Sequence, residues 1–244
     1  MVEFFANSLV DGFLGSNLTG QGIVLLQIFA SIIMVACVIG KWHQLRVQQT
    51  TMSRVTRDIM GEADVLAYHL ARRQNMNSTI ENIYNATCSR MLRQLMPEVR
   101  AQLLARVPGA TAVLTPHEMD LVKAQCDHVL DLEEIRVRKG MDIISTVVTL
   151  SPLLGLLGTV WGVLDAFAEM GGNGATSTVS INAIAPSISA ALVTTVVGLL
   201  VAIPGTLLYT RLEAIIRKIV SDMDGFADNL MGRLAVDYEG RVQQ

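Results

Sequence analysis

Charged residues leave three long gaps along the chain, and each gap is rich in apolar residues. No Asp, Glu, Lys or Arg lies within residues 12–40, 143–164 or 170–210. A helix crosses the roughly 30 Å hydrocarbon layer of a membrane with about 20 residues. The pattern therefore predicts three transmembrane helices. Their expected bounds are 23–40, 142–167 and 181–209. Buried helices of a soluble protein are the alternative, but such helices rarely run this long without a charge.

The positive charges predict how the chain is oriented in the membrane. Of the 19 Lys and Arg residues, 14 lie between residues 41 and 139 and five between 211 and 241. Because positive loops stay on the cytoplasmic side, we expect the N-terminus outside and the C-terminus inside. Residues 41–141 would then form a helical cytoplasmic domain, 168–180 a periplasmic loop, and 210–244 a cytoplasmic C-terminal helix.

The N-terminal segment, residues 1–22, contains no Lys or Arg. A secretory signal peptide has a positive start, so we do not expect this segment to be one. Its Phe and Leu residues predict a periplasmic amphipathic segment lying on the membrane surface, and a frayed extension is the alternative.

Helix signals continue through the polar part of the chain. Ser78 with Glu81, and Thr115 with Glu118, match capping boxes at helix starts. Because no proline follows Pro116 until residue 152, we predict one helix from Pro116 to about Phe167. Apolar residues spaced by threes and fours from 212 to 234 predict that the third crossing also continues, as a seam packed on the chain's own helices or between subunits. The expected fold is an all-α membrane protein whose second and third membrane helices extend far into the cytoplasm.

Composition narrows the possible functions. Hydrophobic residues make up 51% of the chain and charged residues 17%, which excludes a disordered protein. A net charge of −3 without a basic patch argues against nucleic-acid binding. The three cysteines have no metal or disulfide spacing, and no serine or cysteine lies in a nucleophile motif. The sequence therefore predicts no enzyme, no metal and no other cofactor.

The second and third crossings carry more small and hydroxyl residues than simple anchors need. Gly158 and Gly162 form a GxxxG pattern, which lets helices approach closely in lipid. A helical wheel places the hydroxyls of the second crossing on one stripe, which predicts a polar seam or a narrow pore lining, although such hydroxyls also bond to their own helix. The expected packing positions are Gly155, Gly158, Gly162, Gly198, Pro152 and Pro204. The expected ion-pathway positions are Ser145, Thr149, Thr159 and Thr195.

Two segments of these crossings resemble a known family. SPLLGLLGTVWGVLDAF (151–167) and APSISAALVTTVVGLLVAIPGTLLY (185–209) resemble the signature crossings of the TolQ/ExbB/MotA proton-channel family, and the three-span layout resembles its TolQ/ExbB branch. The resemblance implies a multi-pass subunit of the bacterial inner membrane. It further implies a homo-oligomer of five chains around a dimer of an ExbD/TolR-like single-span protein that carries a membrane Asp. A TonB/TolA-like envelope-spanning protein is a further implied partner.

The resemblance also assigns individual residues. Thr159 and Thr195 match the family's threonines and would face the partner's Asp, while Pro152 and Pro204 match its prolines. Many TolQ and ExbB proteins have a Glu in the third crossing, and this chain has Ala190 at the matching position. Asp142 and Asp165 lie at the membrane edges, and no crossing carries a carboxylate, Lys, Arg or His at depth. A proton path here therefore needs the group that the partner supplies.

Two function classes remain open. The favoured hypothesis is an ion-driven motor subunit that converts a gradient, of protons in the first place, into mechanical work across the cell envelope. The alternative is a non-conducting helical scaffold or assembly factor with the same fold. An intramembrane protease is a distant third, because no acid–base pair is present. The sequence does not distinguish H⁺ from Na⁺, nor does it reveal which process is energised.

Overall fold

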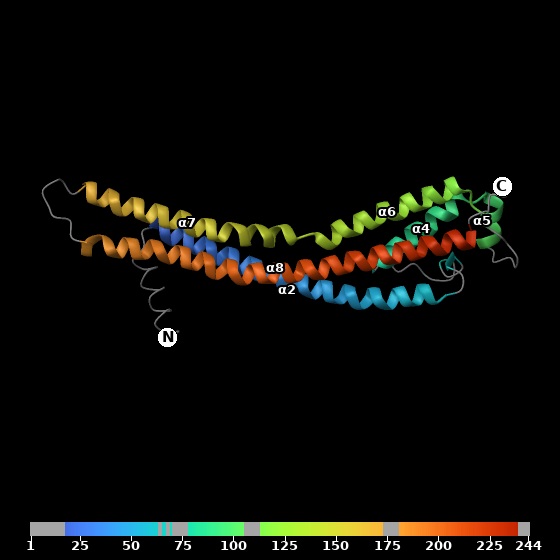
Figure 1. The fold of residues 1–244 in the computed structure, drawn as a ribbon, viewed down its shortest axis with the longest axis horizontal. Helices are drawn as coiled ribbons and strands as arrows, with labels where there is room; N and C mark the ends of the chain where they lie inside the picture. Colours follow the sequence, from blue (N-terminus) through green and yellow to red (C-terminus); the bar gives the residue numbers. More distant parts are fainter. Residues whose placement is uncertain are drawn as a thin grey trace. The chain divides into compact units, whose positions relative to one another are not determined.

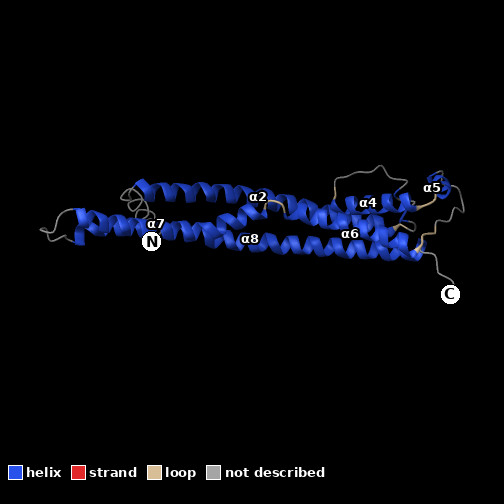
Figure 2. Ribbon diagram, turned by 90° about the horizontal axis from the view of Figure 1, so that it is seen from above, coloured by secondary structure: helices blue, strands red, loops and turns tan. Residues whose placement is uncertain are grey.

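The computed structural model describes residues 18–62, 65–66, 69, 78–104, 113–172 and 181–238, nearly all of them helical (Figure 1, Figure 2). The prediction of an all-α protein is confirmed. The expected amphipathic segment lies mostly outside the described residues, as does most of the expected periplasmic loop. The helices are α2 (Leu18–Gly61), α4 (Thr79–Gln94), α5 (Pro97–Leu104), α6 (Pro116–Arg138), α7 (Met141–Gly172) and α8 (Ile181–Tyr238).

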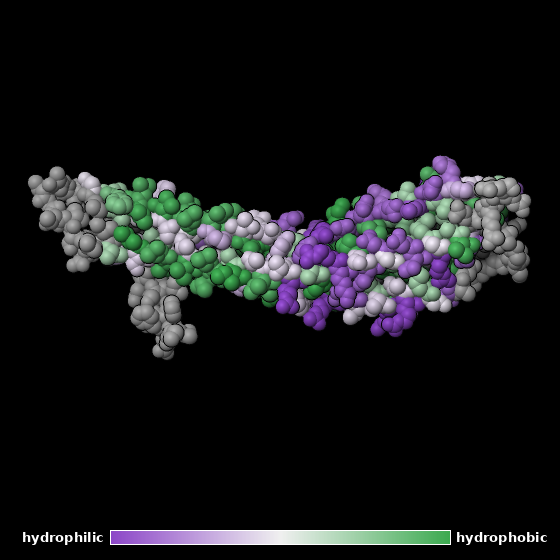
Figure 3. Space-filling model, viewed as in Figure 1, coloured by the Kyte–Doolittle hydropathy of each residue, from purple (hydrophilic) through white to green (hydrophobic). Residues whose placement is uncertain are grey.

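The chain divides into two units. The first, the apolar unit, comprises residues up to Lys41 and residues 140–213; the second, the polar unit, comprises residues 42–139 and those after 213. Hydrophobic residues dominate the surface of the apolar unit in Figure 3. Helices α2, α7 and α8 each contain a segment long and apolar enough to cross a membrane. The structure therefore contains three candidate membrane-spanning helices, as predicted, and they support a multi-pass membrane protein.

The predicted single helix from Pro116 to Phe167 is wrong. Helix α6 ends at Arg138, and the amide of Lys139 donates to the carbonyl of Ile135. Gly140 then adopts a φ of +89°, and α7 begins at the next residue. Glycine takes this left-handed conformation without steric cost, so it is the usual residue just after a helix end. A glycine preceded by basic residues was the stop signal in the sequence.

The third crossing does continue as predicted. Helix α8 runs without interruption for 58 residues, through Pro186 and Pro204. Its apolar seam is completely or almost completely buried within the chain itself. The seam residues, none more than 2% exposed, are Leu212, Ile216, Ile219, Met223, Phe226, Leu230 and Leu234. Packing against the chain's own helices therefore accounts for the seam.

Of the two predicted capping boxes in the polar unit, the one at Thr115 forms and the one at Ser78 does not. The Thr115 hydroxyl accepts from the Glu118 amide, and the Glu118 carboxylate accepts from the Thr115 amide at 2.8 Å. The hydrogen bonds that the Thr115 amide and hydroxyl donate to this carboxylate lower the pKa of Glu118. Ser78 lies at the start of α4 as predicted, but its side chain makes no cap hydrogen bond. The buried α4 start is held from another helix, because the Gln48 amide donates to the hydroxyl of Thr79.

Helices α4 and α6 pack side by side in the polar unit (Figure 1). The Asn82 amide on α4 donates to the Glu133 carboxylate on α6 at 2.9 Å, and Arg136 bonds to the same carboxylate oxygen. The side chain of Glu133 is buried, and a buried carboxylate needs such partners. This polar link fixes how the two helices meet.

Candidate functional site in the apolar unit

Glycines line the contact between α7 and α8. A Cβ atom placed on Gly155 would lie 2.9 Å from the Cα of Thr195, and one on Gly162 would lie 2.6 Å from the Cβ of Ala191. On Gly158 it would overlap the Thr194 side chain. No side chain fits at these positions unless the helices separate. The structure thus places three of the expected packing glycines at one intramolecular contact.

The fourth expected packing glycine, Gly198, makes room for a polar side chain. Gln27 on α2 is fully buried, and its amide nitrogen donates to the carbonyl oxygen of Ser151 on α7 at 3.1 Å. A Cβ on Gly198 would lie 2.6 Å from that oxygen and 3.0 Å from the Gln27 nitrogen. Gln27 therefore joins α2 to α7 at the point where Gly198 of α8 packs against both. Sequence reasoning did not assign Gln27 to the site, because its partner is 124 residues away.

Two neighbouring threonines of α8 share one backbone acceptor on α7. The Thr195 hydroxyl donates to the Gly155 carbonyl at 2.9 Å, and the Thr194 hydroxyl lies 3.1 Å from the same oxygen and 2.7 Å from the Ala191 carbonyl. Thr194 is buried, whereas Thr195 is partly accessible. Close packing at Gly155 is what brings this carbonyl within reach of both.

The expected hydroxyl stripe of α7 lies on an accessible face of the chain. Thr149 is exposed and donates to the Ser145 carbonyl at 2.9 Å; Thr159 is partly exposed and donates to the Leu156 carbonyl at 2.8 Å. Both hydroxyls thus bond to their own helix, yet their oxygens keep lone pairs and their protons can rotate to another acceptor. The structure does not bring Ser145 and Thr149 into contact with the Thr195 side chain.

The two matched prolines lie inside helices. Pro152 is within α7 and partly exposed, and Pro204 is within α8 and exposed. A proline inside a helix leaves the carbonyl four residues earlier without its usual amide donor. The carbonyl oxygens concerned belong to Val148 and Leu200.

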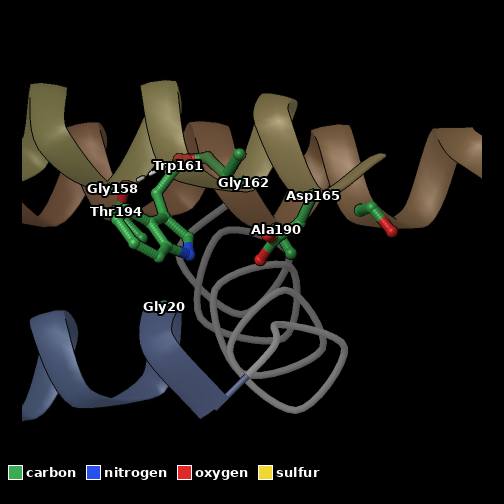
Figure 4. Close-up of a pocket in the computed structure, with 9 residues that line it drawn as sticks. Gly20, Gly158, Trp161, Gly162, Asp165, Ala190 and Thr194 are labelled. Carbon is green, nitrogen blue, oxygen red and sulfur yellow. Dashed lines mark hydrogen bonds between the residues drawn. The ribbon is translucent and has the colours of Figure 1, made fainter. Parts of the chain in front are cut away.

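A small pocket lies near the C-terminal end of α7 (Figure 4). Residues of α2, α7 and α8 line it, among them Gly20, Gly158 and Gly162. Its polar side chains are those of Asp165, Ser187 and Thr194. Ala190 is a lining residue and is 2% exposed. Sequence reasoning placed Asp165 only at the membrane edge and did not connect it with the hydroxyls of α8.

We expect that Thr194→Val destabilises the protein by about 1 kcal/mol, because a buried interhelical hydrogen bond in a membrane protein is worth about that much. Thr194 is buried, whereas Thr195 is partly accessible, and this burial assigns Thr194 a part in stability. Unfolding in mild detergent measures the change. Thr210→Val is the control, because that hydroxyl bonds to its own helix on an exposed face. Equal stability of both variants would contradict the expectation.

Comparison with known proteins adds evidence independent of this geometry. The sequence model of the "MotA/TolQ/ExbB proton channel family" matches residues 95–225. The chain is 36% identical over 98 residues to the biopolymer transport protein ExbB of Xanthomonas campestris pv. campestris (strain B100), a match that covers 40% of this chain and 38% of that protein. It is 26% identical over 225 residues to the Tol-Pal system protein TolQ of Haemophilus influenzae, covering 91% of each chain.

Proposed function

The chain belongs to the MotA/TolQ/ExbB proton channel family, and from this premise we propose that it is the channel or stator subunit of an energy-transducing complex of the inner membrane. In this proposal five copies surround an ExbD/TolR-like single-span dimer. Ion flow, of protons in the first place, drives mechanical work across the envelope. A TonB/TolA-like envelope-spanning protein is the proposed receiver of that work.

The single observation that carries the proposal is the hydroxyl arrangement around Gly155. Thr195 from α8 reaches a carbonyl of α7 at 2.9 Å. Thr159 lies one helical turn after Gly155 on α7, and it remains partly accessible. A partner helix against this face would meet both hydroxyls. No Asp, Glu, Lys, Arg or His lies within residues 143–164 or 181–209, so the titrating carboxylate has to come from that helix.

The hydroxyls would act on the partner's carboxylate by hydrogen bonding. A carboxyl group away from water favours its protonated form, whereas a donated hydrogen bond stabilises the charged form. Each threonine here can release its present carbonyl and donate to the carboxylate instead. The carboxyl group would then lose its proton beside the threonines and regain it where they are absent. Repetition around a ring of subunits couples proton transfer to movement of the partner.

We propose that the N-terminus lies outside and the C-terminus inside, on the strength of the Lys and Arg distribution. At the proposed cytoplasmic boundary of α2, the Arg46 guanidinium lies 5.1 Å from the centre of the Trp42 ring. Tryptophan and arginine of this kind are typical of membrane interfaces.

Cysteine labelling tests this orientation. In a background without the native Cys37, Cys88 and Cys126, a cysteine at Asn173 should react with a membrane-impermeant thiol reagent in cells with a permeabilised outer membrane. A cysteine at Gln102 should react only after the inner membrane is opened, since the proposed orientation places it inside. If the cysteine at Gln102 is labelled in these cells and the cysteine at Asn173 is not, the orientation is the reverse of the one proposed.

The scaffold alternative rests on Ala190, which provides no carboxylate where many family members have one. Copurification followed by ion flux in vesicles separates the two functions. A motor subunit should retain a short single-span protein with a membrane Asp and should conduct ions with it. A chain that assembles but does not conduct ions, whichever partner is present, is a scaffold.

A further inference from the structure

The pocket near the end of α7 brings a carboxylate next to the hydroxyls of α8. In Figure 4 the Asp165 side chain extends from α7 toward Ala190 on α8, with Gly20 of α2 on the other side. Asp165 is the ionisable residue among the described residues that line the pocket; the lining residues of α2 and α8 carry no charge. An acidic group therefore sets the electrostatic character of this space.

Small residues create the space. Gly158 and Gly162 have no side chains, and Ala190 contributes a methyl group that is almost fully buried. The pocket has room for water-sized molecules, and a water molecule or small ion needs polar partners to occupy such a site. A longer side chain at residue 190 would enter the volume beside Asp165. The small side chain of Ala190 leaves this part of the pocket unfilled.

The polar atoms available here suit a cation. The Thr194 hydroxyl donates its proton to backbone carbonyls, so its oxygen lone pairs remain available to accept or coordinate. Ser187 adds a second hydroxyl and Asp165 adds carboxylate oxygens. Oxygen atoms are the ligands that small hard cations prefer. The Trp161 ring, which also lines the pocket, attracts cations through its face.

The pocket also connects with the threonines of the proposed proton path. Thr194 lines it and shares the Gly155 carbonyl with Thr195. Asp165 lies six residues beyond Thr159, about 9 Å along α7. Polar groups thus lead from the C-terminal end of α7 to the shared carbonyl. Asp142, at the N-terminal end of α7, is exposed and does not line this pocket.

We propose that this pocket is an access site for a monovalent cation, H₃O⁺ or Na⁺, and that Asp165 draws the cation from the aqueous phase before it reaches the threonine pair. This inference rests on the proposed function for its purpose, while binding at the pocket is a separate property. A cleft with one sign of charge and apolar walls raises the local concentration of the opposite ion about tenfold or more.

The first experiment measures ion flux into vesicles containing the complete complex with its copurified partner. At fixed membrane potential, one series varies external pH and another varies external Na⁺. Asp165→Asn should raise the half-saturating concentration of the transported ion about tenfold, Asp165→Glu should restore it, and Asp142→Asn should leave it unchanged. A shift in the pH series alone identifies H₃O⁺, and one in the sodium series identifies Na⁺. No shift in either series overturns the proposal.

The second experiment needs no ion flux. The chain has two tryptophans, Trp42 and Trp161, so Trp42→Phe leaves Trp161 as a fluorescent reporter inside the pocket. In the detergent-solubilised complex, its emission should titrate with H⁺ or Na⁺, and Asp165→Asn should abolish that titration. Absence of any titration in the Asp165-containing complex overturns the proposal.

The two experiments separate this inference from the proposed function. If Thr159→Val and Thr195→Val abolish flux while Asp165→Asn conducts and titrates normally, the access site is wrong and the motor function stands. If Trp161 titrates through Asp165 but the complex conducts nothing, cation binding stands and the motor function is wrong.

Discussion

Replacing Gly158 by leucine is expected to abolish the stable, assembled protein. The first added carbon already overlaps Thr194, and the rest of the side chain has no space between α7 and α8. Extra volume in a tight contact costs about 1–3 kcal/mol and sometimes more, and here it also displaces the Thr194 hydrogen bonds. We expect the variant to be lost from the oligomer fraction when membranes are solubilised in mild detergent, and ion-driven activity to be lost with it.

Gly22→Leu is the matched control, because a Cβ at Gly22 on α2 would meet nothing within 4 Å. It places the same apolar side chain in a membrane helix and should assemble normally. If Gly158→Leu elutes with the same oligomer and retains activity, the close approach of α7 and α8 is not required for assembly.

Valine in place of Thr195 or Thr159 is expected to leave assembly intact and to reduce ion-driven work about tenfold or more. Valine matches threonine in shape and removes the hydroxyl. A hydrogen bond to a charged group is worth about 1.5–3 kcal/mol, and each 1.4 kcal/mol corresponds to a factor of about ten. Two measurements test the expectation: the ion-driven activity of the complex in cells, and the amount of partner that copurifies with each variant.

Thr206→Val serves as the control for these variants. Thr206 lies on the same helix as Thr195, and its hydroxyl bonds to the Ala202 carbonyl of its own helix at 2.8 Å. It should keep full activity. If the Thr159 and Thr195 variants also keep full activity with the partner bound, these threonines are packing residues and the proposed proton path fails.

The membrane helices could be predicted from the sequence because the absence of charge is a local property. A run such as 143–164 reads the same whatever surrounds it. The Thr115 capping box could be predicted for the same reason, since its partner Glu118 is three residues away. The spacing of apolar residues from 212 to 234 likewise predicted the seam of α8, although it left open whether the chain's own helices or another subunit would cover it. In each of these cases, the predicted feature depends on residues close together in the sequence.

The two failed predictions have different causes. At Gly140 the glycine after basic residues was a local stop signal, but glycine is also tolerated within a helix, so the pattern left both outcomes open. At Ser78 the helix start was predicted correctly, but its side chain makes no cap hydrogen bond, and the bond at this helix start comes from Gln48 to Thr79, 31 residues apart.

The site was predictable as a set of residue types but not as a set of contacts. Small and hydroxyl residues marked α7 and α8, yet the helical wheel could not show that Thr194 and Thr195 both reach Gly155. Gln27 and Asp165 were missed as members because their neighbours come from other helices. Only the fold brings such residues together.

The shared acceptor at Gly155 has a consequence for genetics. A main-chain oxygen is encoded by every codon, so no point mutation deletes it. A selection for loss of function would recover changes at the donors Thr194 and Thr195, and bulky replacements of the glycine. Codon 155 would therefore be marked as sensitive because no side chain fits there, and the map would give no sign of the hydrogen bonds that its carbonyl oxygen accepts.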